Sequence, residues 1–281
     1  TMRKLYSLVV TRRLQDIRER NKVLQGGNFG VTRGSRTTDL FHVLRALMDE
    51  SVCDERGLEV LLLEIKRAYD SVSWDSLACS LRRIKVPEQY IELLHNIFEH
   101  RTATVLTAHG STERYHPECG LDQGEVNSPL LWLAFYDPLL TRLRHADAGY
   151  KMGTRSRVGS AIKVAHEAFA DDLALAAENR SPQNLVNICR TFMKLHDIEV
   201  HCGKTVHTAK APGGGPTSDN LPKIRMAEGR AGVVDTVHPP TAPFRLLGCW
   251  RSRDGHNNAT VEVIKQPVEC ICRLLRRKGI G

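Results

Sequence analysis

The stretch AIKVAHEAFADDLALAA, residues 161–177, carries the pattern on which the fold depends. Two apolar runs, 161–169 and 173–177, have the length of short β-strands and are joined across Asp171 and Asp172. Two adjacent like charges at a hairpin tip repel each other unless a cation gathers them. We therefore expect a strand–turn–strand unit whose turn presents two carboxylates.

A second apolar run lies about a hundred residues earlier. Leu58–Ile65 is interrupted only by Glu59 and Glu64, which is typical of a central strand buried on both faces. Glu64 stands near its end, where an unpaired charge is costly. Carboxylates from separate strands can bind two divalent ions about 4 Å apart and so promote phosphoryl transfer. Taken alone, however, most Asp-Asp pairs are solvated turns.

Helical periodicity and capping residues predict several helices around these strands. Thr37 or Thr38 is a candidate cap for one of them, and Ser73 for another. Helices are expected at 2–20, from 37 or 38 onward, and at 73–84, 87–98, 128–143, 181–195 and 260–278, with a hairpin at 102–118, a strand at 244–249 and a linker at 211–222. Because strands and helices follow no regular βαβ rhythm, the predicted class is α+β.

The amino-acid composition excludes several classes of protein. The 281 residues hold 40 Lys and Arg against 32 Asp and Glu, a formal net charge of +8 that favours an anionic partner. With 41% hydrophobic residues the chain is globular, and no apolar run approaches the roughly 20 residues of a membrane helix. We expect a protein without a membrane partner, located inside the cell in the nucleus or cytoplasm. The eight cysteines form no CxxC pair, so a zinc or redox module lacks its usual spacing.

Six segments, in order over residues 21 to 250, resemble the motifs of reverse transcriptases from non-LTR retrotransposons. The fingers segment is matched by Asn28–Gly30 with Gly34–Asp39, the first palm motif by Leu61–Val72, the second by Gly120–Leu131, the third (the FADD box) by Phe169–Asp172, the fourth by Asp197–Val200 with Gly203–Thr205, and the fifth by Phe244–Gly248. Any one of these arises by chance, but six in order do not. The chain is identified as a member of this family.

The resemblance implies a right-hand polymerase fold, in which a palm with a central antiparallel sheet is backed by helices and joined to partial fingers. It divides the chain into partial fingers at 1–57, a palm with inserted fingers elements at 58–255, and the start of a thumb or a connecting helix at 256–281. Family thumb, endonuclease and RNase H modules are expected outside these residues. The implied activity is RNA-directed DNA synthesis on an RNA template and DNA primer, from dNTPs, with two Mg²⁺ or Mn²⁺ ions. The oligomeric state stays open.

The resemblance also assigns roles to residues. Glu64, Asp171 and Asp172 are the implied catalytic metal ligands, and Lys204 the cation near the pyrophosphate. Tyr69, five residues after Glu64, falls at the position that excludes a ribose 2′-OH. The remaining implied contacts are Gln123, Gly124, Arg33, Arg36, Lys66 and Arg67 for the nucleotide, and Leu246, Leu247 and Gly248 for the primer end.

Two departures from the family pattern leave other functions open. Family members carry Asp where this chain has Glu64, and Arg33 and Arg36 each fall one residue late, because Thr32 and Ser35 occupy the usual positions. One alternative is therefore a decayed palm that only binds nucleic acid. Another is an RNA-dependent RNA polymerase, although that class usually has an acidic residue in place of Tyr69 and Gly in place of Ala170.

Overall fold

The computed structural model describes most of the chain. The described residues are 2–30, 32–153, 161–178, 182–210 and 224–226, the short pieces 233–234, 237–238, 244–246 and 249–251, and the single positions 261, 265, 269 and 273. The predicted linker at 211–222, most of the predicted helix at 260–278, and Leu247 and Gly248 lie outside the described residues.

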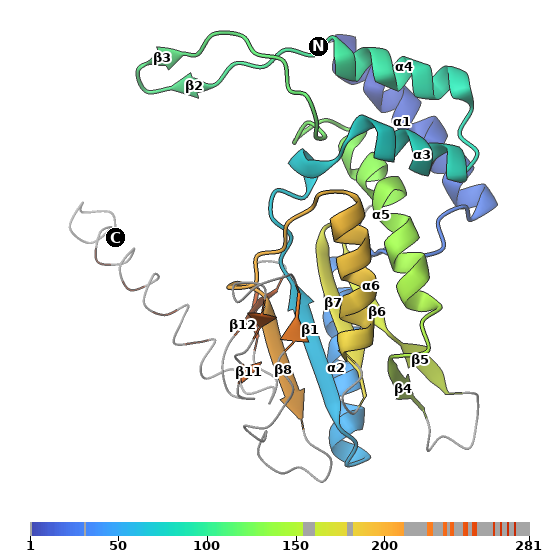
Figure 1. Cartoon of the computed structure of the whole chain (residues 1–281), viewed down its shortest axis with the longest axis vertical. Coiled ribbons are helices and arrows are strands. Elements are labelled where there is room, and N and C mark those ends of the chain that lie inside the picture. The colour runs from blue at the N-terminus through green and yellow to red at the C-terminus, as the bar shows by residue number, and fades with distance from the viewer. Residues whose placement is uncertain are drawn as a thin grey trace.

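A five-stranded sheet forms the centre of the fold, in the order β11-β8-β1-β7-β6 (Figure 1). Its strands are β1 (Leu58–Leu63), β6 (His166–Phe169), β7 (Asp172–Ala177), β8 (Val206–Lys210) and β11 (Val237–His238). Neighbours are antiparallel except β8 and β11, which are parallel. All six residues of β1 are buried, which confirms the expected central strand.

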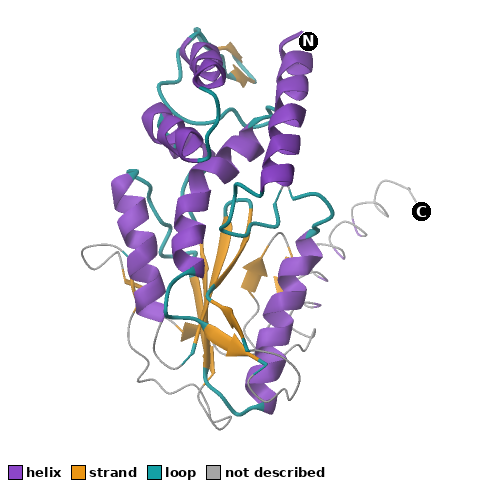
Figure 2. Cartoon of the chain, turned by 90° about the vertical axis from the view of Figure 1, so that its right-hand side faces the viewer, coloured by secondary structure: helices purple, strands orange, loops and turns teal. Residues whose placement is uncertain are grey.

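Helices cover both faces of this sheet (Figures 1 and 2). Alternate residues of β1 point to opposite faces. Leu61 and Leu63 pack in a cluster with α5 (Ser128–Arg144) and α6 (Pro182–Leu195), whereas Val60 and Leu62 pack with α2 (Thr37–Cys53). The sheet is therefore packed between helices on both faces. It also buries a polar pair between neighbouring strands, since His207 Nε2 of β8 lies 3.2 Å from the Glu59 carboxylate of β1.

The other helices lie toward one end of the sheet (Figure 1). They are α1 (Met2–Asn21), α3 (Trp74–Arg83) and α4 (Glu88–Glu99), with a 3₁₀ turn, η1, at Tyr69–Ser71. The remaining short strands pair two by two: β2 (Leu106–Thr107) with β3 (Gly110–Ser111), β4 (Tyr150–Met152) with β5 (Ile162–Val164), β9 (Ile224–Arg225) with β10 (Val233–Val234), and β12 (Phe244–Leu246) with β13 (Cys249–Arg251).

The α+β prediction is confirmed, with three local corrections. The single strand expected at 244–249 is replaced by the antiparallel strands β12 and β13, in which Leu246 pairs with Cys249. The single strand expected at 161–169 is divided at Ala165 into β5 and β6, which belong to different sheets. Neither Thr37 nor Thr38 caps α2, because the helix already begins at Thr37 and the Asp39 carboxylate accepts a hydrogen bond from the Arg36 amide (2.7 Å). The Ser73 cap is confirmed, since its Oγ accepts from the Ser76 amide.

Candidate active site at the turn between β6 and β7

The turn between β6 and β7 presents the adjacent aspartates. Phe169 pairs with Asp172, so Ala170 and Asp171 form the tip of a two-residue turn. Ala170 has a φ of 53°, in the left-handed region that residues with a Cβ seldom adopt. Both aspartates are half-buried. The expected strand–turn–strand unit is therefore present, and its backbone is strained at Ala170.

Glu64 joins these aspartates at the same end of the sheet. It directly follows β1, whose last residue, Leu63, pairs with Leu173 of β7. Burial raises the pKa of Asp172 to about 6, and the charges of Asp171 and Glu64 act in the same direction. The pKa of Asp171 is also raised, chiefly by burial and in part by the charge of Glu64. The three carboxylates therefore interact electrostatically.

Lys204 lies next to Glu64, with its Nζ 3.9 Å from Oε1. The backbone explains this proximity, because the amide of His201 donates to the Glu64 carbonyl (2.8 Å) and the amide of Lys66 donates to the Glu199 carbonyl (2.8 Å). These bonds hold the fourth-motif segment against the end of β1. The side chain of Lys204 is 63% exposed and that of Glu64 is 46% exposed, so solvent screens their attraction.

Tyr69 lies close to the turn as well. Its pKa is raised by burial and by the charge of Asp171. Its ring stacks on Trp132, with centroids 5.5 Å apart, and the Trp132 indole N–H donates to the Ala170 carbonyl (3.0 Å). Trp132 thus contacts both the tyrosine and the turn. It was missed as a functional residue because a tryptophan in an apolar helix predicts only core packing.

The second-motif segment is hydrogen-bonded to the backbone around Tyr69. The Leu121 amide donates to the Tyr69 carbonyl and the Gly120 amide to the Val72 carbonyl, each at 2.8 Å. Gly120 has a φ of +89°, and a Cβ there would lie 2.8 Å from the Asp70 Cα. A side chain at Gly120 would therefore push the two segments apart.

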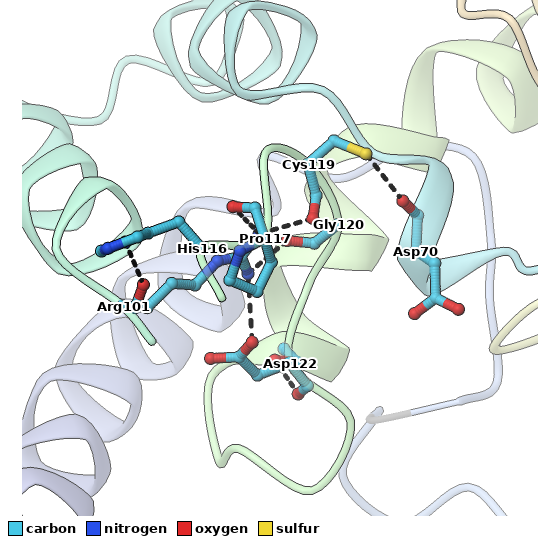
Figure 3. A network of polar contacts seen from close by, with 8 residues as sticks. Asp70, Arg101, His116, Pro117, Cys119, Gly120 and Asp122 are labelled. Carbon is cyan, nitrogen blue, oxygen red and sulfur yellow. Dashed lines mark hydrogen bonds and ion pairs between the residues drawn. The ribbon is translucent and has the colours of Figure 1, made fainter. Parts of the chain in front are cut away.

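Arg101 organises this segment, as Figure 3 shows. Its guanidinium is 5% exposed and donates to the Gly120 carbonyl (2.7 Å), the Asp122 carboxylate (3.1 Å) and the Pro117 carbonyl (3.3 Å), and also to the Cys119 carbonyl. Nothing in the sequence marks this residue, since a lone arginine after a helix is usually a solvated surface side chain.

A groove of about 1070 Å³ runs beside Arg101 and gathers three of the predicted nucleotide contacts. Lys66, Arg67 and Gln123 line it, and Lys66 Nζ binds the Glu199 carboxylate at 2.8 Å, which lowers the pKa of Glu199. Gly124 is exposed on the adjacent turn. Arg33 and Arg36 do not line the groove; both lie on the segment before α2. Leu246 ends β12, opposite Cys249.

The carboxylates have the chemistry that hard divalent cations prefer, because Mg²⁺ and Mn²⁺ bind carboxylate oxygen. In the part of the chain that the structure describes, however, no group of three or more His, Cys, Asp or Glu side chains is arranged to hold a metal ion. The donor set therefore fits such ions by the chemistry of its ligand atoms.

A mostly antiparallel sheet covered by helices, with an aspartate-bearing hairpin at one end, is typical of the palm of a right-hand polymerase. A solved telomerase from Candida tropicalis has a similar fold, with a TM-score of 0.53 and 14% identity over 75% of this chain and 38% of that one. The family model described as "Reverse transcriptase (RNA-dependent DNA polymerase)" matches residues 2–250. The chain belongs to the reverse transcriptase family.

Curated relatives agree with the resemblance to non-LTR elements. The chain is 31% identical over 138 residues to a "Retrovirus-related Pol polyprotein from type-1 retrotransposable element R2" of Nasonia vitripennis, covering 49% of this chain and 13% of the relative. A protein of the same name from Popillia japonica is 27% identical over 75% of this chain and 29% of its own length. The predicted membership in the reverse transcriptases of non-LTR retrotransposons is therefore confirmed. The chain spans less than a third of the length of these relatives.

No helix in the described ranges combines the length and apolar character needed to cross a membrane.

Proposed function

We propose that this chain is an RNA-directed DNA polymerase domain, which transfers deoxynucleotides from dNTPs to a DNA primer 3′-OH on an RNA template. The observation that supports it best is the meeting of Glu64, Asp171 and Asp172 at one end of the sheet, beside Tyr69. Membership in the reverse transcriptase family supports the same reaction. The net charge of +8 suits two polyanionic substrates.

Two Mg²⁺ or Mn²⁺ ions are the proposed cofactors, with Asp171, Asp172 and Glu64 as their ligands. When bound, such ions supply Lewis-acid stabilisation of the attacking and leaving oxygens. Family members generally use divalent ions, and the mutual repulsion of the three carboxylates supports a cationic ligand here. Glu64 is one methylene longer than the usual Asp, so its carboxylate extends farther from the backbone.

Other side chains of the domain orient the nucleotide. Tyr69, held against Trp132, is the proposed barrier to a ribose 2′-OH. Lys204 is the proposed cation for the leaving pyrophosphate, where it can also donate a proton. The further proposed contacts are Gln123, Gly124, Lys66, Arg67, Arg33 and Arg36 for the nucleotide and its phosphates, and Leu246, Leu247 and Gly248 for the primer end.

The proposed subdomain boundaries follow the family pattern. Residues 1–57 form partial fingers, 58–255 the palm with inserted fingers elements, and 256–281 the start of a thumb or a connecting helix. The strand β1, which carries Glu64 at its end, begins at the proposed boundary between fingers and palm. The proposed location of the protein is inside the cell, in the nucleus or the cytoplasm.

Primer extension on an RNA template, with dNTPs and either Mg²⁺ or Mn²⁺, tests the proposed reaction. Wild type, Glu64→Asp and Asp171→Ala are compared at equal folded concentration. We expect extension by wild type and loss of at least ~10³-fold in Asp171→Ala, with template binding retained. Extension by Glu64→Asp alone would instead indicate a decayed site on an intact scaffold. No extension by any of the three would contradict the proposal for this chain.

A further inference from the structure

The segment between α1 and α2 lies along the outer edge of β6. We call residues 25–30 the strap. Its Phe29 amide donates to the Ala168 carbonyl (2.9 Å), and the Gly26 carbonyl lies 2.8 Å from His166 Nε2. On its other side, the amides of Gln25 and Gly26 donate to the buried carboxylate of Asp137 on α5 (2.9 and 2.8 Å). The strap is thus bonded to both the hairpin and a core helix.

Asn28 is the strap residue that reaches the turn itself. Its Nδ2 donates to the Ala170 carbonyl (2.9 Å), and its Oδ1 accepts from the Ala170 amide (2.9 Å) and from the Gly30 amide (2.8 Å). One side-chain amide therefore satisfies both backbone groups of Ala170. Only Asn and Gln carry a donor and an acceptor side by side in this way.

Gly30 permits this close approach. A Cβ on Gly30 would lie 2.5 Å from the Ala170 nitrogen and 3.0 Å from its Cα, distances at which the strap or the turn must shift. Ala170 itself is held at a φ of 53°, which is unfavourable for a residue with a Cβ. A strained turn persists only where neighbouring groups hold it in place. At Ala170 these groups are the Asn28 side chain and the Trp132 indole, which both form hydrogen bonds to it.

We propose that Asn28 is a positioning residue, which fixes the Asp171 carboxylate by holding the preceding Ala170 from both its amide and its carbonyl. Its effect on synthesis rests on the proposed function. The hydrogen bonds of Asn28 go to the backbone of the turn, and it acts on Asp171 through that backbone rather than on the reacting atoms.

Amide-resolved hydrogen–deuterium exchange tests the contact without requiring any activity. In Asn28→Ala the Ala170 amide loses its acceptor, so we expect its exchange to accelerate at least ~10-fold. Thr32→Ala is the matched control, since Thr32 Oγ1 donates to the Asn28 carbonyl and not to the turn. Equal exchange at Ala170 in wild type and Asn28→Ala would overturn the proposal.

Single-turnover addition of one nucleotide then separates positioning from simple loss of folded protein. We expect the rate constant of Asn28→Ala to fall roughly 10- to 100-fold with the burst amplitude retained, because a shift of about 1 Å costs about 10²-fold. A lower amplitude at an unchanged rate would reduce Asn28 to a stability role. If wild type itself adds no nucleotide, the proposed function fails, whereas exchange at Ala170 still decides whether Asn28 holds the turn.

Gly30→Ala provides a second variant if Asn28→Ala does not fold. Its added methyl group should displace the strap from Ala170 and accelerate exchange at the same amide. Gly203→Ala is its control, because a Cβ on Gly203 would meet only the His201 side chain, at the ordinary contact distances of 3.6 and 3.7 Å. Unchanged exchange at Ala170 in Gly30→Ala would contradict the proposed contact.

Discussion

Burial raises the pKa of both Asp171 and Asp172 at the end of the sheet, and the nearby charge of Glu64 raises both further. An aspartate whose pKa is raised in the folded state binds its proton more tightly there than in the unfolded chain. The stabilising effect of this bound proton is then fully present below the pKa of the unfolded state. It is lost as the pH rises through the pKa of the folded state. At neutral pH the two charged aspartates therefore destabilise the fold.

Asp172→Asn should stabilise the protein at pH 7.5. The pKa of Asp172 is raised from an ordinary 3.8 to about 6, so the substitution removes a charge that costs ~1–2 kcal/mol after allowance for solvent screening. The gain should shrink as the pH falls from 6 to 4. Urea denaturation at pH 4, 6 and 7.5 measures it. Glu113→Gln, at an exposed residue, is the control, and a gain independent of pH would contradict the electrostatic account.

Tyr69→Val should relax sugar selectivity. The Tyr69 ring is braced by Trp132 and lies near enough to Asp171 to experience its charge, so its removal opens space beside the proposed reaction site. We expect the ratio of ribonucleotide to deoxynucleotide incorporation to rise at least ~10-fold, with dNTP addition reduced less than about threefold. Competition assays measure this ratio. Leu106→Val, at an exposed residue of β2 that does not line the groove, should leave it unchanged.

At the scale of elements, the segment 117–122 has its shape because one buried guanidinium bonds several of its carbonyls. Arg101 supplies a planar fork of donors that a lysine ammonium cannot reproduce. This segment leads directly into the turn that carries Gln123 and Gly124. The backbone of the second motif therefore depends on a residue outside that motif.

Arg101→Met should lower the free energy of unfolding by ~2–4 kcal/mol, because it leaves buried carbonyls and the Asp122 carboxylate without their donor. The KM for dNTPs should also rise, since the Gly120–Gly124 turn loses its support. Chemical denaturation and steady-state kinetics measure the two effects. Arg82→Met is the control, because Arg82 forms an exposed pair with Glu88 and should change neither. Equal effects of both variants would refute the special role of Arg101.

Most elements were predictable because their signals are local. The apolar run of β1 and the cap at Ser73 act within a few residues, and both were confirmed. The division of 161–169 was missed, since it depends on β5 pairing with β4 rather than on the local pattern. The strap was recognised only as a fingers motif. Its bond to Ala170 joins residues 142 apart, and no local pattern encodes such a contact.

The same limit applies to the candidate site. The three carboxylates, Tyr69 and Lys204 were named from motifs, and the structure brings them to one end of the sheet. Their functional roles stay predictions. Arg101, Trp132 and Asn28 were missed because each acts on backbone groups, which any sequence supplies.

Over the whole molecule, the excess of basic residues should make nucleic-acid binding strongly dependent on salt. We expect the logarithm of the association constant to fall linearly with the logarithm of salt concentration. Lys66→Ala with Arg67→Ala should reduce that slope by about 1–2, because both exposed side chains line the groove. Fluorescence anisotropy with an RNA–DNA duplex measures it. Arg45→Ala, on α2, should preserve the slope; a flat salt response in wild type would contradict the argument.

The position of β1 between β7 and β8 also affects how the protein is made. Leu62 pairs with Ala174 and with Val206, so its first partner is synthesised about 110 residues later and its second about 140 residues later. At about 5–20 residues per second, the first interval lasts roughly 6 to 22 s. During it, the apolar segment LEVLLL has neither partner strand, and such segments pair readily with other chains. Translation speed and chaperone access should therefore determine the yield of folded protein.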